Sequence, residues 1–286
     1  MKIALLGANG QLGCAFQSFF QELRNSGFEL YAYTRSNLDL TDGKSIRHAL
    51  DILKPDVVIN AAAFTDVDSA ESELSDNLKV NYEAVTTLGN ILSKKSTRLI
   101  HFSTDYVFSS RTLKYFKTND DFCPINKYGE AKSKAEKFLR EVLPESSTII
   151  RTAWLYGNSK KNFVNKVHLK AKLNEEISVV NDQFGQPTWT KDLVTATFEI
   201  IKKEMKNGIY HVTGNEVISR YHLACQIYEL SGSNSLKINA INSDALETKA
   251  KRPQYSCLDL SFWEENDSWK PTDWKESLAK HLRLNS

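Results

Sequence analysis

The sequence predicts an α/β protein in which a doubly wound parallel sheet is followed by a smaller second lobe. In the first half, short apolar runs alternate with longer amphipathic stretches, which is the order expected of parallel strands joined by helices. A glycine-rich turn separates the first apolar run from the first helical stretch. After about residue 155 the alternation loosens, which indicates a change of architecture. The 286 residues are enough for one large α/β unit or two smaller lobes.

Individual elements follow from the spacing of apolar residues in the first half. Continuous apolar runs, typical of strands covered on both faces, predict strands at 2–7, 28–33, 56–63, 98–104 and 147–157. Helical spacing predicts helices at 11–23, 45–54, 78–95 and 126–143. Proline follows the second and the fourth of these helical stretches, at Pro55 and Pro144, and ends them.

The second half contains two loop-like stretches, at 158–166 and 181–190. Its other segments predict helices at 190–205 and 219–232, a strand at 208–214 and a terminal helix within 268–284. We therefore expect a first domain at 1–155 and a mainly substrate-binding lobe at 156–286, from which the chain can cross back to the first domain.

Composition excludes several classes of protein. Apolar residues make up 41% and charged residues 25%, as in ordinary globular proteins, and the net charge of +2 is spread without a basic stripe. Nucleic acid is therefore not an expected partner. The four cysteines lie far apart without a CxxC pair, which argues against a disulfide framework or a zinc site and suits a reducing cytoplasm. We see neither a signal peptide nor an apolar run of membrane-spanning length.

The turn Gly7-Ala8-Asn9-Gly10-Gln11-Leu12-Gly13 lies between the first strand and the first helix. Glycines there allow a tight turn and a close approach of backbone N–H groups to a pyrophosphate, and the helix N-terminus favours negative charge. Because a bare glycine triplet is weak evidence, the position after an N-terminal strand carries the prediction of a dinucleotide site. An ordinary glycine-rich turn is the alternative.

The second strand ends in "YAYTRSN", where the adenosine ribose would lie. A site for NAD usually has an acidic residue there, whereas Arg35 would suit a 2′-phosphate, so we expect NADP(H). A solvated surface arginine is the alternative. Three alanines, Ala61 to Ala63, end the third strand and leave room for a flat ligand, although tight helix packing would explain them equally well.

Tyr128 and Lys132 are four residues apart at the start of a predicted helix, so they share one face. A tyrosine has a pKa of about 10, and a nearby ammonium would lower it and make a better acid or base. The pattern is common by chance. Here, however, Ser103, Thr104 and Asp105 stand at the end of the fourth strand, where a doubly wound sheet holds its ligand. Together they predict the reduction of a carbonyl, with Tyr128 as its acid.

The chain resembles the dTDP-4-dehydrorhamnose reductase family of the extended short-chain dehydrogenase/reductase superfamily. The resemblance rests on "GANGQLG", "NAAAFTDVDSAE", "STDYVF", "NKYGEAKSKAE" and "DQFGQPT", which follow one another in the family's order across almost the whole chain. It implies a Rossmann-type fold with a C-terminal substrate lobe, and NADPH as cofactor, with NADH possible as well. It also implies reduction of the C4 ketone of dTDP-4-dehydro-L-rhamnose to dTDP-L-rhamnose, for a cell-surface polysaccharide.

The resemblance further implies roles for individual residues. Thr104, Tyr128 and Lys132 would be the catalytic trio, the last two also contacting the cofactor. The other cofactor positions would be Gly7, Gly10, Gln11, Leu12, Arg35, Asp39, Leu40, Ala62, Ala63 and Thr65. Besides Thr104 and Tyr128, the substrate positions would be Val67, Asp105, Tyr106, Trp154, Asn162, Phe163, Gln186 and Arg252. Trp154 could form a flat wall against the sugar, with a core tryptophan as the alternative.

The chain also departs from the family pattern. Ala15 replaces a glutamate that helps some members bind magnesium at a dimer interface, so we expect neither that metal nor that mode of dimerisation. Before the tyrosine, Thr118 and Phe122 stand where the family pattern has glutamate and proline. After the lysine, Ser133 and Ala135 stand where it often has leucine and glycine. These changes bear on the identity of the sugar and leave the chemistry unchanged.

Two alternative functions follow from the same motifs. One is a reductase or epimerase of another nucleotide-linked 4-keto-6-deoxy sugar, and the other is a non-catalytic regulatory subunit of the same fold. An epimerase would favour NAD and an acidic residue in place of Arg35, and the intact trio argues against a regulatory subunit. We expect a cytoplasmic monomer or homodimer whose partner is a dTDP-sugar, with no membrane contact.

Overall fold

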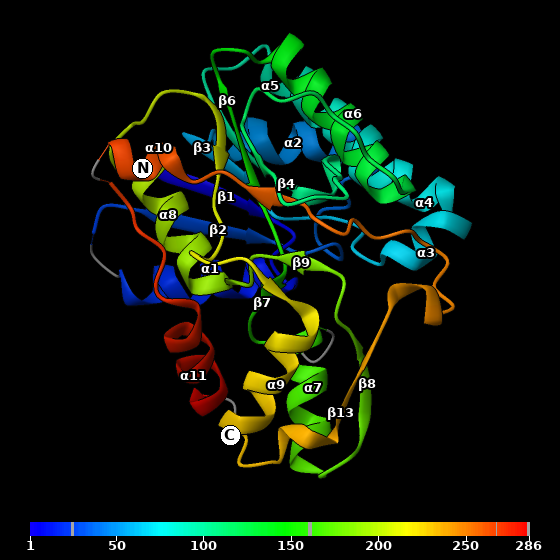
Figure 1. Cartoon of the computed structure of the whole chain (residues 1–286). Coiled ribbons are helices and arrows are strands. Elements are labelled where there is room, and N and C mark those ends of the chain that lie inside the picture. The colour runs from blue at the N-terminus through cyan, green and yellow to red at the C-terminus, as the bar shows by residue number, and fades with distance from the viewer. Residues whose placement is uncertain (24–25, 160–161, 267, 285–286) are drawn as a thin grey trace.

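A six-stranded, all-parallel sheet forms the centre of the protein, in the order β11-β6-β4-β3-β1-β2. A computed structural model describes residues 1–23, 26–159, 162–266 and 268–284 (Figure 1). The strands of the sheet are β1 (Lys2–Leu6), β2 (Glu29–Tyr33), β3 (Val57–Asn60), β4 (Arg98–Thr104), β6 (Ser147–Thr152) and β11 (Gly208–His211). The chain turns outward in both directions from β1, whose neighbours are β2 and β3. A doubly wound sheet binds its ligand at this switch point.

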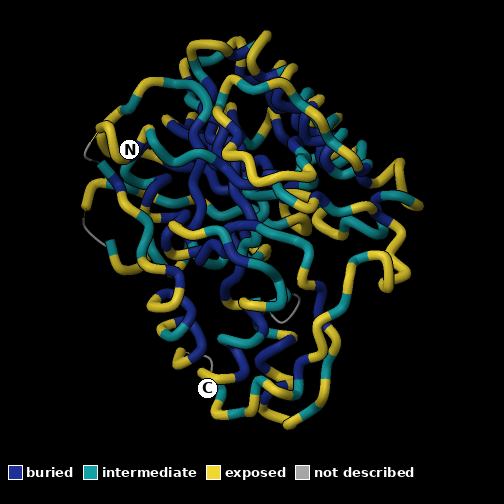
Figure 2. The backbone as a smooth tube through the Cα atoms, viewed as in Figure 1, coloured by how far each residue is buried: buried dark blue, intermediate teal, exposed yellow. Residues whose placement is uncertain are grey.

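Helices cover both faces of the sheet, as Figure 1 shows. One layer contains α1 (Gln11–Glu22) and α8 (Thr190–Lys202), and the other contains α2 (Gly43–Leu53), α5 (Ala84–Leu92) and α6 (Lys127–Val142). Neighbouring strand residues point to opposite layers: Leu5 packs with α1 and α8, whereas Leu6 packs with the other layer. The buried residues accordingly concentrate along the sheet in Figure 2. The predicted fold class is confirmed.

The smaller lobe packs α7 (Phe163–Lys172), α9 (Arg220–Leu230) and α11 (Trp274–Leu284) around a core of its own. A parallel pair, β8 (Ile177–Val180) and β13 (Ile238–Ile241), lies along it. The segment 208–214 does not stay in this lobe, because β11 joins the edge of the central sheet beside β6. The stretch 181–190, expected as a loop, contains the short strands β9 (Phe184–Gly185) and β10 (Thr188–Trp189). The division at residue 155 stays a prediction.

The helix expected at 78–95 contains an irregular turn. It consists of α4 (Leu74–Leu78), a π-helical turn (Lys79–Glu83) and α5. A π-helical turn widens a helix locally and re-aims its side chains, often at functional sites. The remaining short elements are α3 (Val67–Ser72), a 3₁₀ turn (Asp105–Val107), β5 (Tyr115–Phe116), β7 (Leu155–Tyr156), β12 (Ile218–Ser219), 3₁₀ turns (Ser235–Lys237 and Ser243–Ala245), β14 (Cys257–Leu258) and α10 (Ser261–Glu265). Within the described ranges, no helix combines the length and apolarity needed to cross a membrane.

A fully buried ion pair anchors α6 to the sheet. Arg151 of β6 contacts Glu136 of α6, with 2.7 Å between Nη2 and Oε2, and both side chains are 0% exposed. The guanidinium also donates to the Thr118 carbonyl and lies 4.9 Å from the centre of the Phe108 ring. Such a pair is stabilising only while both charges are present, because each offsets the cost of burying the other.

We therefore expect Glu136→Gln to destabilise the fold by about 3–5 kcal/mol, because it leaves the Arg151 guanidinium buried without its counter-charge. Urea denaturation measures the free energy of unfolding. Lys203→Ala is the matched control, since it breaks a surface ion pair with Glu199 in α8 and should change that free energy by less than about 1 kcal/mol. Equal, small losses in both variants would contradict the anchoring role of the buried pair.

Candidate active site

The glycine turn after β1 forms a cradle with no room for side chains. Gly7 has φ +79°, and a Cβ atom on it would lie 2.6 Å from the backbone nitrogen of Ala62. Gly10 precedes α1, and among the described residues no side chain caps that helix. A backbone turn that opens a helix in this way presents N–H groups to an anion. The cradle therefore fits the pyrophosphate of a dinucleotide.

Gln11 ties this turn to the second half of the chain. Its Nε2 atom donates to the Leu155 carbonyl at 3.1 Å, and its Oε1 atom accepts from Asn162 at 2.7 Å. Leu12, by contrast, is buried in the core, so only its backbone is available to a ligand. Asn162 also caps α7 through the backbone nitrogen of Asn165. The structure thus brings Asn162 to the cofactor turn, and its expected contact with the substrate stays a prediction.

The tip of β2 presents a cation to solvent. The Arg35 side chain is 85% exposed, and its Nε atom lies 3.6 Å from the Asp39 carboxylate. Asp39 accepts from the backbone and hydroxyl of Thr41, and these bonds, with Arg35 a smaller contributor, lower the pKa of its carboxyl group. Leu40 packs at the edge of the core. Because the ion pair is long and exposed, Arg35 can turn to a phosphate at little cost.

Two asparagines fix the loop after β3 through hydrogen bonds to its backbone. Asn60 accepts from the backbone nitrogen of Ala62, and Asn81 bonds both the N–H and the carbonyl group of Phe64. The expected cofactor positions Ala62, Ala63 and Thr65 keep half-buried or exposed surfaces at the carboxyl edge of the sheet. Asn81 lies in the π-helical turn, a kind of irregularity that is frequent at functional sites. The sequence carries no signal for Asn81, because the backbone groups of Phe64 that it bonds lie 17 residues away.

Thr104, at the end of β4, meets the start of α6. Its hydroxyl donates to Asp105 at 3.0 Å and accepts from the backbone nitrogen of Tyr106 at 3.1 Å. The Tyr106 and Tyr128 rings pack edge to face with centres 6.2 Å apart. Gly129 permits this approach, because a Cβ atom on it would lie 2.2 Å from the Tyr106 carbonyl oxygen. The expected group of Thr104, Asp105, Tyr106 and Tyr128 is therefore assembled in one place.

Burial raises the pKa of the Tyr128 phenol, and the Asp105 carboxylate raises it further, while Thr104 lowers it. The prediction of a lowered pKa for Tyr128 is wrong, because the burial of the phenol outweighs the effect of the nearby amine. The Lys132 side chain is 1% exposed, and its Nζ atom donates to the Phe102 carbonyl at 2.6 Å, so it does not offset the burial of the phenol. Burial in turn lowers the pKa of Lys132 to about 8, against the opposing effect of Glu136. Tyr128 therefore keeps its proton at neutral pH and is suited to act as an acid.

The sugar-side residues divide into two groups. Trp154 has φ +43° and carries the Arg220 guanidinium 3.6 Å above its ring centre, with the Phe163 ring 5.0 Å from the same guanidinium. The sequence carries no signal for Arg220. Burial lowers the pKa of its guanidinium, and Tyr106 and Asp105 oppose that shift, which places the charge beside the site. A stacked arginine near a carboxylate is a ready partner for a phosphate.

The second group is occupied by protein contacts. Arg252 makes a bidentate pair with Asp68, with 2.6 Å between Nη2 and Oδ2, next to the half-buried Val67 at the start of α3. Gln186 is buried and bonds the backbone N–H and carbonyl groups of Leu258. Gln186 therefore holds β14 in place, and its direct contact with a substrate stays a prediction.

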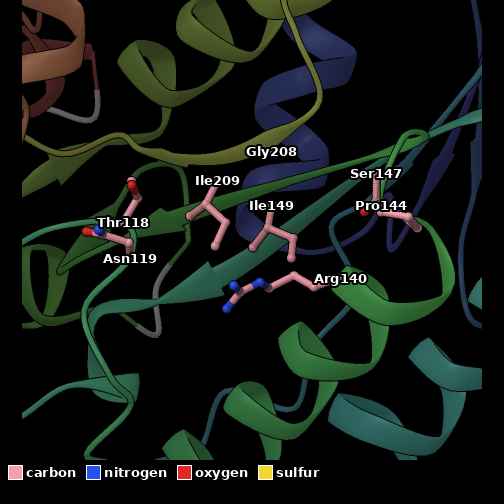
Figure 3. A pocket seen from close by; sticks show the side chains of 8 residues that line it. All are labelled: Thr118, Asn119, Arg140, Pro144, Ser147, Ile149, Gly208 and Ile209. Carbon is pink, nitrogen blue, oxygen red and sulfur yellow. The ribbon is translucent and has the colours of Figure 1, made fainter.

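The protein also has a cavity of about 300 Å³, whose lining residues are drawn in Figure 3. Its lining consists of Thr118, Asn119, Arg140, Pro144, Ser147, Ile149, Gly208 and Ile209. Ser147 and Gly208 are the first residues of β6 and β11, so the cavity borders the amino edge of the sheet. Arg140 is more than three turns beyond Tyr128 on α6, roughly 18 Å along the helix. This cavity is therefore separate from the catalytic group.

A parallel sheet with a glycine cradle after β1, together with a threonine, a tyrosine and a lysine at its carboxyl edge, defines a Rossmann-type oxidoreductase of the short-chain class. The family model described as "RmlD substrate binding domain" matches residues 1–285. The chain belongs to that family.

Curated relatives match the chain over nearly its whole length. It is 34% identical to the spore coat polysaccharide biosynthesis protein SpsK of Bacillus subtilis, over 100% of this chain and 98% of that protein. It is also 34% identical to a dTDP-4-dehydrorhamnose reductase of Aggregatibacter actinomycetemcomitans, over 99% and 98%. A dTDP-4-keto-6-deoxy-D-glucose reductase of Streptomyces niveus is again 34% identical, over 97% and 95%.

Solved structures are similar in fold and in sequence. A dTDP-4-dehydrorhamnose reductase of Clostridium acetobutylicum has a TM-score of 0.92 and 32% identity, over 100% of this chain and 99% of that one. The dTDP-4-dehydrorhamnose reductase of Bacillus anthracis, solved in complex with NADP, has a TM-score of 0.92 and 29% identity, over 99% of each chain.

Asp105 provides a test of the site's electrostatics. Burial raises the pKa of its carboxyl group to about 6, although hydrogen bonds from Ser256 and Thr104 oppose the rise. The folded chain thus keeps a proton that the unfolded chain has lost, so this group's contribution to stability falls as the pH rises from about 4 to about 6. Carbon-13 NMR of the aspartate carboxyl groups should show a midpoint near 6.

In the same titration, Ser256→Ala should raise the Asp105 midpoint further, because it removes a donor that stabilises the carboxylate. Ser261→Ala is the control, since that hydroxyl bonds Asp259 instead and should leave the midpoint unchanged. A midpoint near that of an ordinary aspartate in the unsubstituted chain would show that the carboxylate is solvated.

Proposed function

We propose that the chain reduces the C4 ketone of dTDP-4-dehydro-L-rhamnose to dTDP-L-rhamnose with NADPH, for a rhamnose-containing polysaccharide. The observation that carries the proposal is the contact of Tyr128 with Thr104 at the carboxyl end of β4, on the same edge of the sheet as the glycine cradle. Relatives that match nearly the whole chain are named dTDP-4-dehydrorhamnose reductases, and one relative was solved with NADP. The chain is an oxidoreductase of nucleotide-linked sugars.

The residues present fit a dinucleotide. The Gly7 cradle would hold its pyrophosphate, because any side chain there would collide with Ala62. Arg35, exposed at the tip of β2, would bind the 2′-phosphate that distinguishes NADPH from NADH. NADH remains a second candidate, because the exposed arginine does not exclude it. NADPH, when bound, supplies a hydride.

Tyr128 acts as the general acid in the proposed reaction. As the carbonyl carbon gains a hydride, its oxygen becomes an alkoxide, and the Tyr128 hydroxyl donates a proton to that oxygen. The Thr104 hydroxyl, held by the backbone nitrogen of Tyr106, would orient the same oxygen by turning its proton from Asp105 to the substrate. The proton transfer leaves a Tyr128 phenolate, which a protonated Lys132 beside the cofactor ribose would stabilise until the phenolate regains a proton from solvent. Hydride and proton together complete the conversion of the ketone to the alcohol.

The nucleotide diphosphate would lie between the two lobes. Arg220 offers a guanidinium stacked on Trp154, and Arg252 lies close enough to affect its charge. Two arginines suit two phosphate groups, because each guanidinium can bond two oxygens at once. Arg252 must release Asp68 to take part, which would couple substrate binding to the position of α3. Trp154 would then form one wall of the sugar pocket.

A reductase of a different 4-keto-6-deoxy sugar is the second candidate. It is favoured by the relative named dTDP-4-keto-6-deoxy-D-glucose reductase, which is as similar to this chain as the rhamnose enzyme. The two sugars differ in the configuration of the ring, so a panel of dTDP-4-keto sugars, assayed with NADPH and with NADH, separates the two candidates.

The cytoplasm is the proposed cellular location, because NADPH and nucleotide sugars are cytoplasmic metabolites and the four cysteines form no disulfide in the described chain. The oligomeric state, monomer or homodimer, stays a prediction.

Tyr128→Phe should lower kcat for the reduction of dTDP-4-dehydrorhamnose by about 10²- to 10⁴-fold, because it removes the acid and little else. Oxidation of NADPH, followed by its absorbance, measures the rate, and fluorescence titration should find NADPH bound as in the unsubstituted enzyme. Reduction of the sugar at the original rate by Tyr128→Phe would rule out the assigned acid.

Gly7→Ala should abolish detectable binding of NADPH, because the added Cβ would force Ala62 away from the cradle. Gly27→Ala is the matched control. Gly27 also has a positive φ, +83°, but among the described residues nothing lies within 4 Å of its added Cβ, so the substitution carries the backbone strain without the collision. Fluorescence titration compares the two variants, and equal affinities for NADPH would place the pyrophosphate elsewhere.

A further inference from the structure

A buried chain of polar side chains links the cofactor loop to the catalytic lysine. Asn60 accepts from the backbone nitrogen of Ala62 through Oδ1, and its Nδ2 atom lies 3.2 Å from His101 Nδ1. The other ring nitrogen of His101, Nε2, lies 3.2 Å from Lys132 Nζ, which donates to the Phe102 carbonyl. The three side chains come from β3, β4 and α6 and are all buried.

We propose that Asn60 and His101 are positioning residues that set the protonation state of Lys132 by presenting an N–H donor to its amine. In catalysis, where the proposal rests on the proposed function, they would set the upper pH limit of the reductase. Neither residue touches the reacting atoms, so both would act through Lys132.

The donor and acceptor roles along this series of hydrogen bonds follow from the two groups at its ends. The Ala62 N–H group can only donate, so it holds the oxygen of Asn60 and turns the NH₂ group of Asn60 toward His101. His101 Nδ1 must then accept, which leaves the ring proton on Nε2, facing Lys132. A neutral Lys132 amine accepts a hydrogen bond from the Nε2–H group of His101 and donates one to the Phe102 carbonyl. Every buried polar atom in this series then has a partner.

A charged Lys132 is incompatible with this arrangement of donors and acceptors. An ammonium has no lone pair, so His101 would have to accept at Nε2 and carry its proton on Nδ1, which faces the NH₂ group of Asn60. Rotating the Asn60 amide would only move the conflict to the N–H group of Ala62. One buried donor would therefore face another donor, which is unfavourable where water cannot enter.

The charged and titratable groups around Lys132 are His101 on β4, Tyr128 one turn earlier on α6 and Glu136 one turn further along it. Glu136 favours the ammonium, but it is shared with Arg151. Burial and Lys132 both lower the pKa of His101, so its ring stays neutral. Burial lowers the pKa of Lys132, and the proposed hydrogen bonds would lower it further. Because the ammonium stabilises the Tyr128 phenolate, activity should fall as the pH rises through the Lys132 midpoint.

Two substitutions test the proposal in the full-length protein. His101→Gln replaces the ring with an amide whose oxygen can accept from an ammonium, and Asn60→Asp supplies a carboxylate that accepts from both Ala62 and His101 Nδ1. Both should raise the Lys132 midpoint by about one pH unit, which is a tenfold change in proton affinity. NMR of protein labelled with carbon-13 at the lysine Cε atoms measures the midpoint, with the Lys132 signal assigned by its loss in Lys132→Met.

His168→Gln is the matched control, because this buried histidine of α7 bonds Ser231 in the smaller lobe and should leave the Lys132 midpoint unchanged. The alkaline limb of kcat/KM for NADPH-dependent reduction should move upward with the midpoint in His101→Gln, which carries no added charge. A purely structural role would lower kcat/KM at every pH without moving that limb.

An unchanged Lys132 midpoint in His101→Gln, or in Asn60→Asp if the first variant does not fold, would overturn the proposal. If the unsubstituted enzyme reduces none of the dTDP-4-keto sugars, the proposed function fails, whereas the NMR titration still decides whether Asn60 and His101 control Lys132.

Discussion

The site depends on one constraint, the close docking of the start of α6 against the end of β4. Gly129 lets the helix approach the Tyr106 carbonyl, and the buried Arg151–Glu136 pair holds the middle of the same helix to β6. Without the first contact, Tyr128 would move away from Thr104. Without the second, Lys132 would move away from the Phe102 carbonyl of β4. The reacting groups are therefore positioned by packing at two points of α6.

Much of the fold could be predicted from the sequence, because strands covered by helices on both faces must be apolar throughout. The central strands and the helices between them were found in this way, at nearly their observed positions. Local pattern could not show that the segment 208–211 returns to the main sheet, since strand pairing joins residues remote in the chain. Nor could it show the π-helical turn, from which Asn81 bonds the backbone of Phe64 in the loop after β3.

The candidate site divides in the same way. The glycine cradle and the trio of Thr104, Tyr128 and Lys132 could be predicted, because they depend on short motifs at the ends of strands. Arg220 and His101 could not, because an arginine or histidine acquires meaning only from the groups that surround it. The pKa of Tyr128 was predicted in the wrong direction for a related reason: sequence spacing reveals a neighbouring charge, but it does not reveal how deeply the phenol is buried.

The raised pKa of Tyr128 keeps its proton in place before the reaction, and it also makes the phenol a weaker acid. An acid that transfers its proton late must hold it until the carbonyl oxygen becomes basic, and an alkoxide is a stronger base than a phenolate even when burial has raised the phenol's pKa. Proton transfer from Tyr128 is then favourable only after the hydride has moved, so the phenol stays protonated in the ground state at neutral pH. Lys132, held by His101 and the Phe102 carbonyl rather than by Tyr128, leaves that proton in place. The charge of the lysine would matter after the transfer, when the phenolate has formed. The buried hydrogen bonds from Asn60 and His101 would act on this step by setting the protonation state of Lys132.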